Sequence, residues 1–324
     1  MEVSPLQEHK GKVFLGFLIG AFFLWLSIKD IDWEVTKTDF SKVTFRYIFG
    51  IIFATAAFFW IKAFRWTYVL NPIKHLKTSS LFPPMMAGVF LNFFVSILVG
   101  EFVRSFLLGK RFGLSKTAIL ASIFLERVYD VLTLLFLLAL TIALTSATFP
   151  MDQLILYFTV MFLIAFALIS LVVWKDPTIH WLGRITEGFS AEFRSKWHAR
   201  LDKGVEGLRS LTEPKLVFPI LIISVIQWTF ICLAKWFAMV AIGLDVPFSA
   251  GILVTVLIAF ALILPQSPAQ IGVIEFGFVY GLKPFGISAS DALTSALIYH
   301  LLYIVAMCFV IAPTFKKWIS KEYV

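Results

Sequence analysis

The chain has 324 residues, of which 60% are hydrophobic and only 15% are charged, and its mean hydropathy is +0.90. A soluble domain is about half apolar and a quarter charged, so this composition excludes an ordinary soluble domain and indicates an all-α protein that crosses the membrane several times. The formal net charge of +8 would suggest nucleic-acid binding in a soluble protein. In a membrane protein the placement of the basic residues instead indicates which loops face the cytoplasm, so we expect no nucleic-acid partner.

Six stretches are apolar enough to cross a membrane, which takes about 20 residues. In chain order these predicted spans are 13–28, 45–66, 117–146, 153–174, 216–244 and 290–313. Two further apolar stretches, 81–100 and 250–275, contain helix breakers. The breakers are Pro83, Pro84 and Gly100 in the first stretch, and Pro265, Pro268 and Gly272 in the second.

The placement of basic residues decides between two topologies. If all eight stretches crossed, the basic loop around Lys110 and the very basic segment 175–215 would lie outside, which contradicts the cytoplasmic preference of Lys and Arg. If the two interrupted stretches are re-entrant hairpins, most of the 28 Lys and Arg residues lie inside. We therefore expect six spans plus two re-entrant hairpins, with both termini cytoplasmic. Broken backbone at membrane depth needs a cover of protein or water, so a cavity is expected between the hairpins.

The chain also contains a weak internal repeat. The stretch that begins at Glu101 reads EFVRSFLLGKRFGLSKTAILASIFLERVYDVL, and the stretch that begins at Glu275 reads EFGFVYGLKPFGISASDALTSALIYHLLYIV. With a one-residue gap, the alignment pairs Glu101 with Glu275 and Arg127 with His300.

A second match extends the repeat to the preceding spans. The triplet Phe-Arg-Trp around Arg65 corresponds to Ala-Lys-Trp around Lys235. Three crossings per half would invert the second half. We therefore predict a single membrane domain, 1–324, made of two inverted repeats, 1–150 and 151–324, each with two spans, a re-entrant hairpin and one further span.

The polar segment 175–215 separates the fourth and fifth predicted spans. Apolar residues recur in it every three or four positions, and basic residues fill the positions between them. This pattern predicts a cytoplasmic amphipathic helix. The sequence leaves open whether this helix lies on the inner leaflet, held by anionic lipid, or packs on the ends of the bundle.

Three ionisable residues, Glu126, Arg127 and Asp130, fall inside the third predicted span, roughly 12 Å from its start. Glu126 and Asp130 share a helix face, and Arg127 can reach Asp130 one turn away. Ionisable groups at this depth are costly and indicate function. Two readings remain: a self-neutralising cluster that fixes the helix in the bundle or, as we favour, an Arg127 that meets an anionic head group while the carboxylates orient it or exchange protons.

Glu101 and Glu275 each close one of the interrupted stretches. Near Glu275, prolines free backbone groups that could bind a polar head group together with three side chains, those of Gln266, Ser267 and Gln270. The alternative is that each glutamate caps backbone amides, or pairs with a buried base such as Lys235 or Arg104.

Three further residues are candidates for charge contacts. Arg65 and Lys235 stand beside tryptophans; we expect Arg65 to extend to the membrane interface and the deeper Lys235 to contact an anion. His300 is expected to be hydrogen-bonded rather than catalytic, although its place opposite Arg127 in the repeat adds it to the candidates.

The sequence contains no phosphate-binding Walker loop and no Cys and His spacing typical of zinc. The short acidic triplet at Asp30 to Asp32 is too brief to indicate a glycosyltransferase. We therefore expect no catalytic residues, no metal and no cofactor, and do not expect an enzyme.

Three motifs together resemble the lysylphosphatidylglycerol synthetase transmembrane, or flippase-like, family. They are GEFVRSFLL from Gly100, ERVYDVL from Glu126 and LPQSPAQIGVIE from Leu264. The resemblance implies movement of a lipid-linked polar head group between leaflets of a prokaryotic plasma (inner) membrane, with aminoacylated phosphatidylglycerol or polyprenyl-linked intermediates as substrates. The motif residues carried over by position are Glu101, Arg104, Glu126, Arg127, Asp130, Pro265, Gly272 and Glu275.

Two departures from the family pattern leave the substrate open. Ala269 and Gln270 stand where the family often has paired glycines, and His300 stands where it often has arginine. The sequence ends at Val324 without a soluble aminoacyltransferase domain, so we do not expect it to make the aminoacyl lipid.

Our leading hypothesis is a lipid flippase that takes a phospholipid or a glycolipid. The rivals are a membrane enzyme acting on a lipid-linked sugar or phosphate and an accessory subunit of a lipid-modifying synthase. Oligomeric assembly stays open.

Overall fold

The computed structural model describes residues 18–29, 31–34, 36, 43–95, 97–144, 159, 163, 214–262 and 267–319. Within these ranges the chain forms helices and short connections and no strands, which confirms the all-α fold expected of a polytopic membrane protein. Gln266, nearly all of the predicted span 153–174 and most of the segment 175–215 lie outside the described residues.

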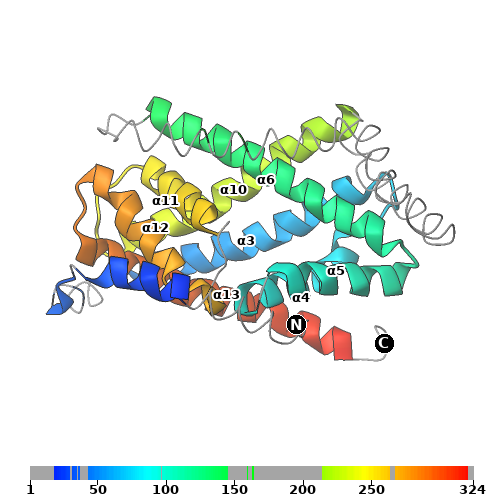
Figure 1. Cartoon of the computed structure of the whole chain (residues 1–324), viewed down its shortest axis with the longest axis horizontal. Helices are drawn as coiled ribbons and strands as arrows, with labels where there is room; N and C mark the ends of the chain where they lie inside the picture. The colour runs from blue at the N-terminus through cyan, green and yellow to red at the C-terminus, as the bar shows by residue number, and fades with distance from the viewer. Residues whose placement is uncertain are drawn as a thin grey trace, which may run out of the picture.

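Figure 1 shows the helices as one elongated bundle. In chain order they are an N-terminal helix (Leu18–Ile28), α3 (Phe45–Leu70), α4 (Thr78–Phe94), α5 (Ile97–Phe112), α6 (Lys116–Leu144), α10 (Pro214–Ala241), α11 (Phe248–Ala261), η2 (Pro268–Gln270), α12 (Val273–Leu282), η3 (Lys283–Phe285) and α13 (Ala289–Ile319). Among the described residues, three helices are long and apolar enough to cross a membrane: Phe45–Leu70, Lys215–Ala241 and Ala289–Pro313. Each of the three helices begins within one residue of the start of a predicted span, at 45, 216 or 290.

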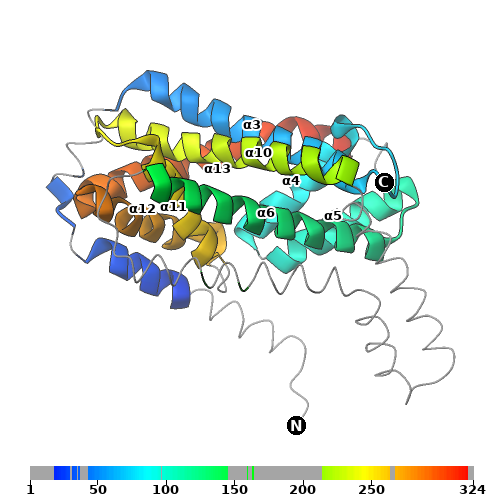
Figure 2. The same ribbon diagram turned by 90° about the horizontal axis from the view of Figure 1, so that it is seen from above.

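Helices α3 and α10 form an antiparallel pair and lie side by side along the bundle (Figure 2). The backbone N–H of Thr44, at the start of α3, donates to the carbonyl of Ala241, at the end of α10, over 3.0 Å. Gly50 allows the ring of Phe237 to approach the α3 backbone closely. Six spans with two hairpins predict this antiparallel pairing, whereas eight full crossings would make the two helices parallel.

The interrupted stretch 81–100 folds as part of a helical hairpin, α4–α5. The two helices pack so closely that a Cβ on Gly100 would lie 2.2 Å from the carbonyl oxygen of Gly88. Lys74 Nζ, before α4, donates to the carbonyl of Phe112, at the end of α5, over 3.2 Å, so the hairpin returns to the end of the bundle where it began. The expectation that Pro83 and Pro84 break the helix is wrong. They lie in the N-terminal half of α4, where few hydrogen bonds depend on their missing N–H groups, and the chain reverses after Phe94 instead.

The second interrupted stretch gives a second antiparallel hairpin, α11–α12. Gly277 packs against Ile258, and Gly281 packs against Val254. At its tip, Gly272 has φ +86°, and a Cβ there would lie 2.1 Å from a backbone oxygen of the N-terminal helix. Only glycine fits both this conformation and this close approach.

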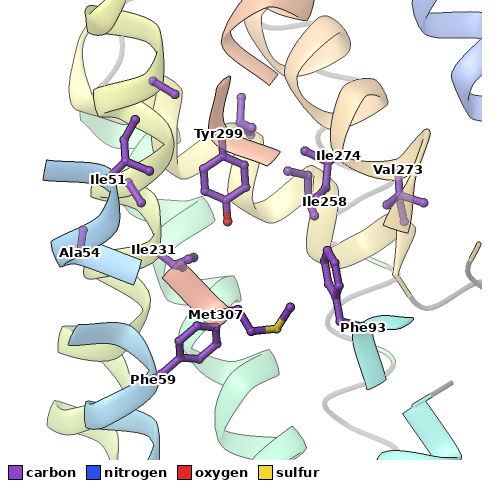
Figure 3. Close-up of a cluster of buried hydrophobic side chains, with 14 of the residues drawn as sticks. Ile51, Ala54, Phe59, Phe93, Ile231, Ile258, Val273, Ile274, Tyr299 and Met307 are labelled. Atoms are coloured by element: carbon purple, nitrogen blue, oxygen red, sulfur yellow. The ribbon is translucent and has the colours of Figure 1, made fainter. Parts of the chain in front are cut away.

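The helix contacts keep the same pattern when the two halves are exchanged. Helix α3 contacts α4 as α10 contacts α11, α5 contacts α6 as α12 contacts α13, and α4 contacts α13 as α11 contacts α6. An inverted repeat produces this pattern, while its boundaries at 150 and 151 stay predictions. At the centre, α4 of the first hairpin contacts η2 at the tip of the second. The Phe93 ring of α4 also lies 6.0 Å from His300 and 5.4 Å from Tyr303, both on α13. Figure 3 shows the surrounding core of aliphatic and aromatic side chains.

Candidate functional site

Helix α6 is tied to two other helices by buried ion pairs. Arg104 Nη1, from α5, lies 2.6 Å from Glu126 Oε2, and the two side chains are 3% and 0% exposed. Arg65 Nη1, from α3, lies 2.7 Å from Asp130 Oδ1. The two carboxylates of α6 therefore hold cations from α5 and α3 in an environment where isolated charges are costly.

The guanidinium of Arg104 is also stacked on an aromatic ring. Its Cζ lies 3.3 Å from the centroid of the Trp66 ring, a distance typical of a cation–π contact. The indole N–H of Trp66 donates to Ser122 Oγ over 3.2 Å, which fixes the ring beneath the guanidinium. Trp66 thus orients Arg104, a predicted site residue, although no role was predicted for Trp66 itself.

Arg65 is fully buried, so the expectation that it reaches the membrane interface is wrong. It donates to Asp130 and, over 3.0 Å, to Ser224 Oγ of α10. The indole of Trp228, also on α10, donates to the same Asp130 oxygen over 3.0 Å. Because Asp130 supplies a counter-charge inside the bundle, the Arg65 guanidinium is neutralised without contact with bulk water.

Arg127 is the exposed cation of this cluster. Its side chain is 42% exposed, although it contacts Glu101 and its Nη1 lies 3.6 Å from Asp130 Oδ2. The latter contact confirms the predicted pairing one turn along the helix. Asn92 Nδ2 lies 3.5 Å from Glu101, so the hairpin α4–α5 contributes to holding the carboxylate. One side of the Arg127 guanidinium stays open to an additional anion.

The sequence reading missed Lys62, which lies one turn before Arg65 and is 7% exposed. The signal was available, because a lysine one turn before an arginine inside an apolar run marks a charged face. Lys62, Arg65, Arg104 and Arg127 oppose three carboxylates, Glu101, Glu126 and Asp130, so this part of the bundle carries an excess positive charge.

Several polar atoms of this cluster lack a hydrogen-bond partner in the described part of the chain, including Glu101 Oε2 and Glu126 Oε1. The Nε and Nη2 atoms of both Arg65 and Arg104 are buried and have no hydrogen-bond partner within the described part of the chain. Buried guanidinium donors without acceptors are costly, so oxygen atoms from a ligand or water would stabilise this cluster.

A second polar group occupies the tip of the hairpin α11–α12. Glu275 Oε2 accepts from the backbone N–H of Gly272 over 2.6 Å, and its Oε1 lies 2.8 Å from His300 Nδ1. His300 Nε2 lies 2.9 Å from the carbonyl of Ala269. A carbonyl only accepts, so Nε2 is the donor to Ala269, and Nδ1 is hydrogen-bonded to the Glu275 carboxyl group. Glu275 therefore both caps a backbone amide and holds a base.

Two details of the prediction for the tips need correction. Glu101 and Glu275 do not close the interrupted stretches; each lies inside the helix that follows the break, α5 or α12. Ser267 does not face an open site, because it is buried and its hydroxyl donates to the carbonyl of Ile271 over 2.5 Å, closing the turn.

The paired residues of the repeat make corresponding contacts. Arg127 contacts Glu101 in the first half, and His300 contacts Glu275 in the second. The halves differ at a neighbouring pair. The alignment places Phe278 at the position of Arg104 and Tyr299 at the position of Glu126. These two rings are tilted at 37° to each other with centroids 5.7 Å apart, so an aromatic pair replaces an ion pair.

Lys235 lies beside a cavity of about 110 Å³. The side chain is buried, and its Nζ lies 4.8 Å from the centroid of the Tyr299 ring. Among the described residues, no carboxylate pairs with it. The cavity is lined by Phe58, Trp228, Ile231, Lys235, Thr255, Ile258, Ala259, Leu262, Gln270, Ile274, Tyr299 and Tyr303. Lys235 and Gln270, both predicted as site residues, therefore share one cavity.

The predicted residues form three adjoining groups rather than one site. Glu101, Arg104, Glu126, Arg127 and Asp130 make the first, Ser267, Glu275 and His300 the second, and Lys235 and Gln270 the third. Trp228 joins the first and third groups, because its indole bonds to Asp130 and its ring lines the Lys235 cavity. In the described ranges no group of three or more His, Cys, Asp or Glu side chains is placed to hold a metal ion.

Comparison with known proteins agrees with this membrane architecture. The family model described as "Lysylphosphatidylglycerol synthase TM region" matches residues 13–311. A UPF0104 membrane protein of Methanocaldococcus jannaschii is 24% identical over 220 residues, which cover 66% of this chain and 88% of that protein. No solved structure matches the chain. Since the family model covers nearly the whole chain, the protein belongs to the family of the lysylphosphatidylglycerol synthase transmembrane region.

Proposed function

We propose that this protein moves a lipid with an anionic head group between the two leaflets of a prokaryotic plasma membrane. The observation that carries the proposal is Arg127, a half-exposed guanidinium held by two carboxylates within an otherwise apolar helix. An anionic lipid that crosses the membrane needs a cation along its path, because the transfer of an unpaired charge into an apolar medium is prohibitive.

The charge balance around Arg127 supports an anionic ligand rather than a purely structural cluster. A self-neutralising cluster would match cations and carboxylates. Here three arginines pair with three carboxylates, and the buried Lys62 beside Asp130 and Glu126 adds a fourth basic side chain. Glu101 and Asp130 fix the direction of Arg127 without occupying all of its donors. Among charged amino acids, arginine is the one best suited to a phosphate group, because its planar fork donates two parallel hydrogen bonds.

The helical hairpins support the route. We propose that both are re-entrant, one from each side, so that their tips meet near the middle of the membrane. Polar backbone at the tip of the hairpin α11–α12 is tolerated at this depth because protein covers it. In a transporter built of inverted repeats, the substrate site lies at such an interface between the halves.

The test is a leaflet-exchange assay on the full chain in vesicles, with fluorescent phosphatidylglycerol as the probe. The wild type is expected to move the probe at least tenfold faster than Arg127→Ala, and the lipid should be recovered chemically unchanged. Arg46→Ala is the matched control and should leave the rate unchanged, since Arg46 is exposed and its side chain contacts the neighbouring Tyr47. Equal rates for the wild type and Arg127→Ala would remove Arg127 from the mechanism.

A double variant distinguishes a structural role of Arg127 from a role in binding the head group. Arg127→Ala leaves Glu101 without its partner, which could slow exchange by disturbing the fold. Arg127→Gln combined with Glu101→Gln removes both charges and keeps a polar side chain at each position. If Arg127 binds the head group, exchange stays slow in the folded double variant; recovery to the wild-type rate would indicate a structural ion pair only.

A further inference from the structure

We infer that the cavity beside Lys235 binds a singly charged phosphate diester of a lipid head group. The inference rests on the proposed function for the presence of a head group inside the bundle, and it names the chemical class that this part of the bundle selects. Lys235 is 3% exposed, and in the part of the chain that the structure describes it has neither an ion pair nor a hydrogen bond.

The repeat explains why Lys235 lacks a counter-charge. Its counterpart in the first half, Arg65, bonds to Asp130 on α6. The alignment places Tyr303 on α13 at the position of Asp130, and Tyr299 at the position of Glu126. Both carboxylates of the first half are thus replaced by phenols in the second, while the cation is kept.

Tyrosine rings satisfy a lysine only in part. The cation–π contact between Lys235 and Tyr299 offsets only part of the penalty for burying an unpaired ion. A buried ammonium group with no counter-ion therefore favours an anion from outside the chain. One cation without a partner balances one negative charge, which fits a phosphate diester and not a diphosphate.

The lining of the cavity suits a phosphate oxygen. The cavity of about 110 Å³ has room for several water molecules or one phosphate group. Tyr299, Tyr303 and Gln270 bring hydroxyl and amide donors to its wall. In Figure 3 the hydroxyl end of Tyr299 is directed toward Ile231, another lining residue. Apolar residues make up most of the remaining wall, as expected beside the glycerol and acyl part of a lipid.

The position of the cavity also fits a second stage of transport. Trp228 separates it from Asp130, which in turn contacts Arg127. A head group held first at the exposed Arg127 would therefore reach Lys235 by passing one aromatic side chain. In this arrangement Arg127 receives the lipid and Lys235 holds its phosphate inside the bundle.

The test measures binding to the purified full chain by isothermal titration calorimetry. The probes are dihexanoyl-phosphatidylglycerol, glycerophosphoglycerol (the same diester without acyl chains) and geranyl diphosphate. Wild-type protein should bind the short-chain lipid, and Lys235→Met should bind it at least tenfold more weakly. Lys283→Met is the matched control: Lys283 also lies 4.8 Å from a tyrosine ring but is exposed, so its loss should leave the affinity unchanged.

Further arms decide the source and the charge of the ligand. Binding of the lipid alone assigns the cavity to lipid head groups, and equal binding of the acyl-free diester would overturn that assignment. Tighter binding of the diphosphate would overturn the single-charge argument. Tyr303→Asp supplies the carboxylate that the first half has, so it should weaken diester binding at least tenfold while the protein stays folded.

Thermal stability separates this role of Lys235 from a structural one. Without ligand, Lys235→Met should be at least as stable as the wild type, because it removes an uncompensated buried charge. Lower stability combined with unchanged lipid affinity would refute the inference. If the wild type exchanges lipid but Lys235→Met binds the lipid normally, only this inference is refuted. If binding depends on Lys235 but the wild type exchanges no lipid, only the proposed function is refuted.

Discussion

The buried pair Arg104–Glu126 offers the strongest test of how charges stabilise this bundle. The two atoms lie 2.6 Å apart, and neither side chain reaches solvent appreciably. At an effective dielectric constant of 20, unit charges at this separation attract each other by about 6 kcal/mol. Desolvation offsets most of that attraction, but removal of one partner leaves an uncompensated buried charge and costs about 3–5 kcal/mol.

The surroundings predict which single variant suffers more. In Glu126→Gln, Arg104 keeps the Trp66 ring and has Glu101 Oε2 at 4.0 Å, so we expect a loss at the lower end, about 3 kcal/mol. Arg104→Met leaves the fully buried carboxylate of Glu126 without its hydrogen bond, so we expect a loss near 5 kcal/mol. The double variant removes both charges and should be nearer the wild type than either single variant.

Thermal unfolding in detergent measures these differences with a thiol-reactive dye. Cys232 is buried and Cys308 is exposed, so in a Cys308→Ser background the dye reports the exposure of Cys232 on unfolding. Asp245→Asn, at an exposed carboxylate, is the control and should not shift the transition. If the two single losses simply add in the double variant, Arg104 and Glu126 are not energetically coupled and the reasoning is refuted.

Two further predictions concern the tip of the second hairpin and the topology. Gly272→Ala should destabilise the protein by about 2 kcal/mol more than Gly113→Ala in the same assay, because both glycines have positive φ but only at Gly272 would the added Cβ overlap the N-terminal helix at Gly20; equal losses would deny that contact any contribution. Single cysteines at Lys110 and Lys283 should react with impermeant reagent from opposite sides of intact vesicles, since the two hairpins begin at opposite ends of the α3–α10 pair; labelling from the same side would instead support eight full crossings.

The long helices and the ionisable residues within them could be predicted from the sequence. Apolar runs of sufficient length predicted α3, α6, α10 and α13, because the membrane sets their length and composition. Glu126, Arg127 and Asp130 stood out because ionisable residues are rare within such runs. Helix breakers pointed to the two interrupted stretches, but the reversal of the first hairpin depends on the close packing of Gly88 on Gly100, which breakers do not encode.

The ion-pair partners of the charged residues could not be predicted from the sequence in the same way. Arg65 was expected at the interface because neighbouring residues in the sequence do not reveal which face of α3 is buried. Its counter-charge, Asp130, is 65 positions away along the chain. Trp228 joined the site only because α10 packs against α3 and α6.

The weak repeat shows where the sequence stops and the tertiary structure takes over. By itself the sequence determined a helical membrane protein, the residues whose burial would be costly, and the correspondence of Arg127 with His300 and of Arg65 with Lys235. Only the tertiary structure decided that Arg65 is neutralised by Asp130 whereas Lys235 faces a tyrosine and a cavity. The physical reason is that the neutralisation of a buried charge depends on groups within a few ångströms on other helices, and helical packing alone sets those distances.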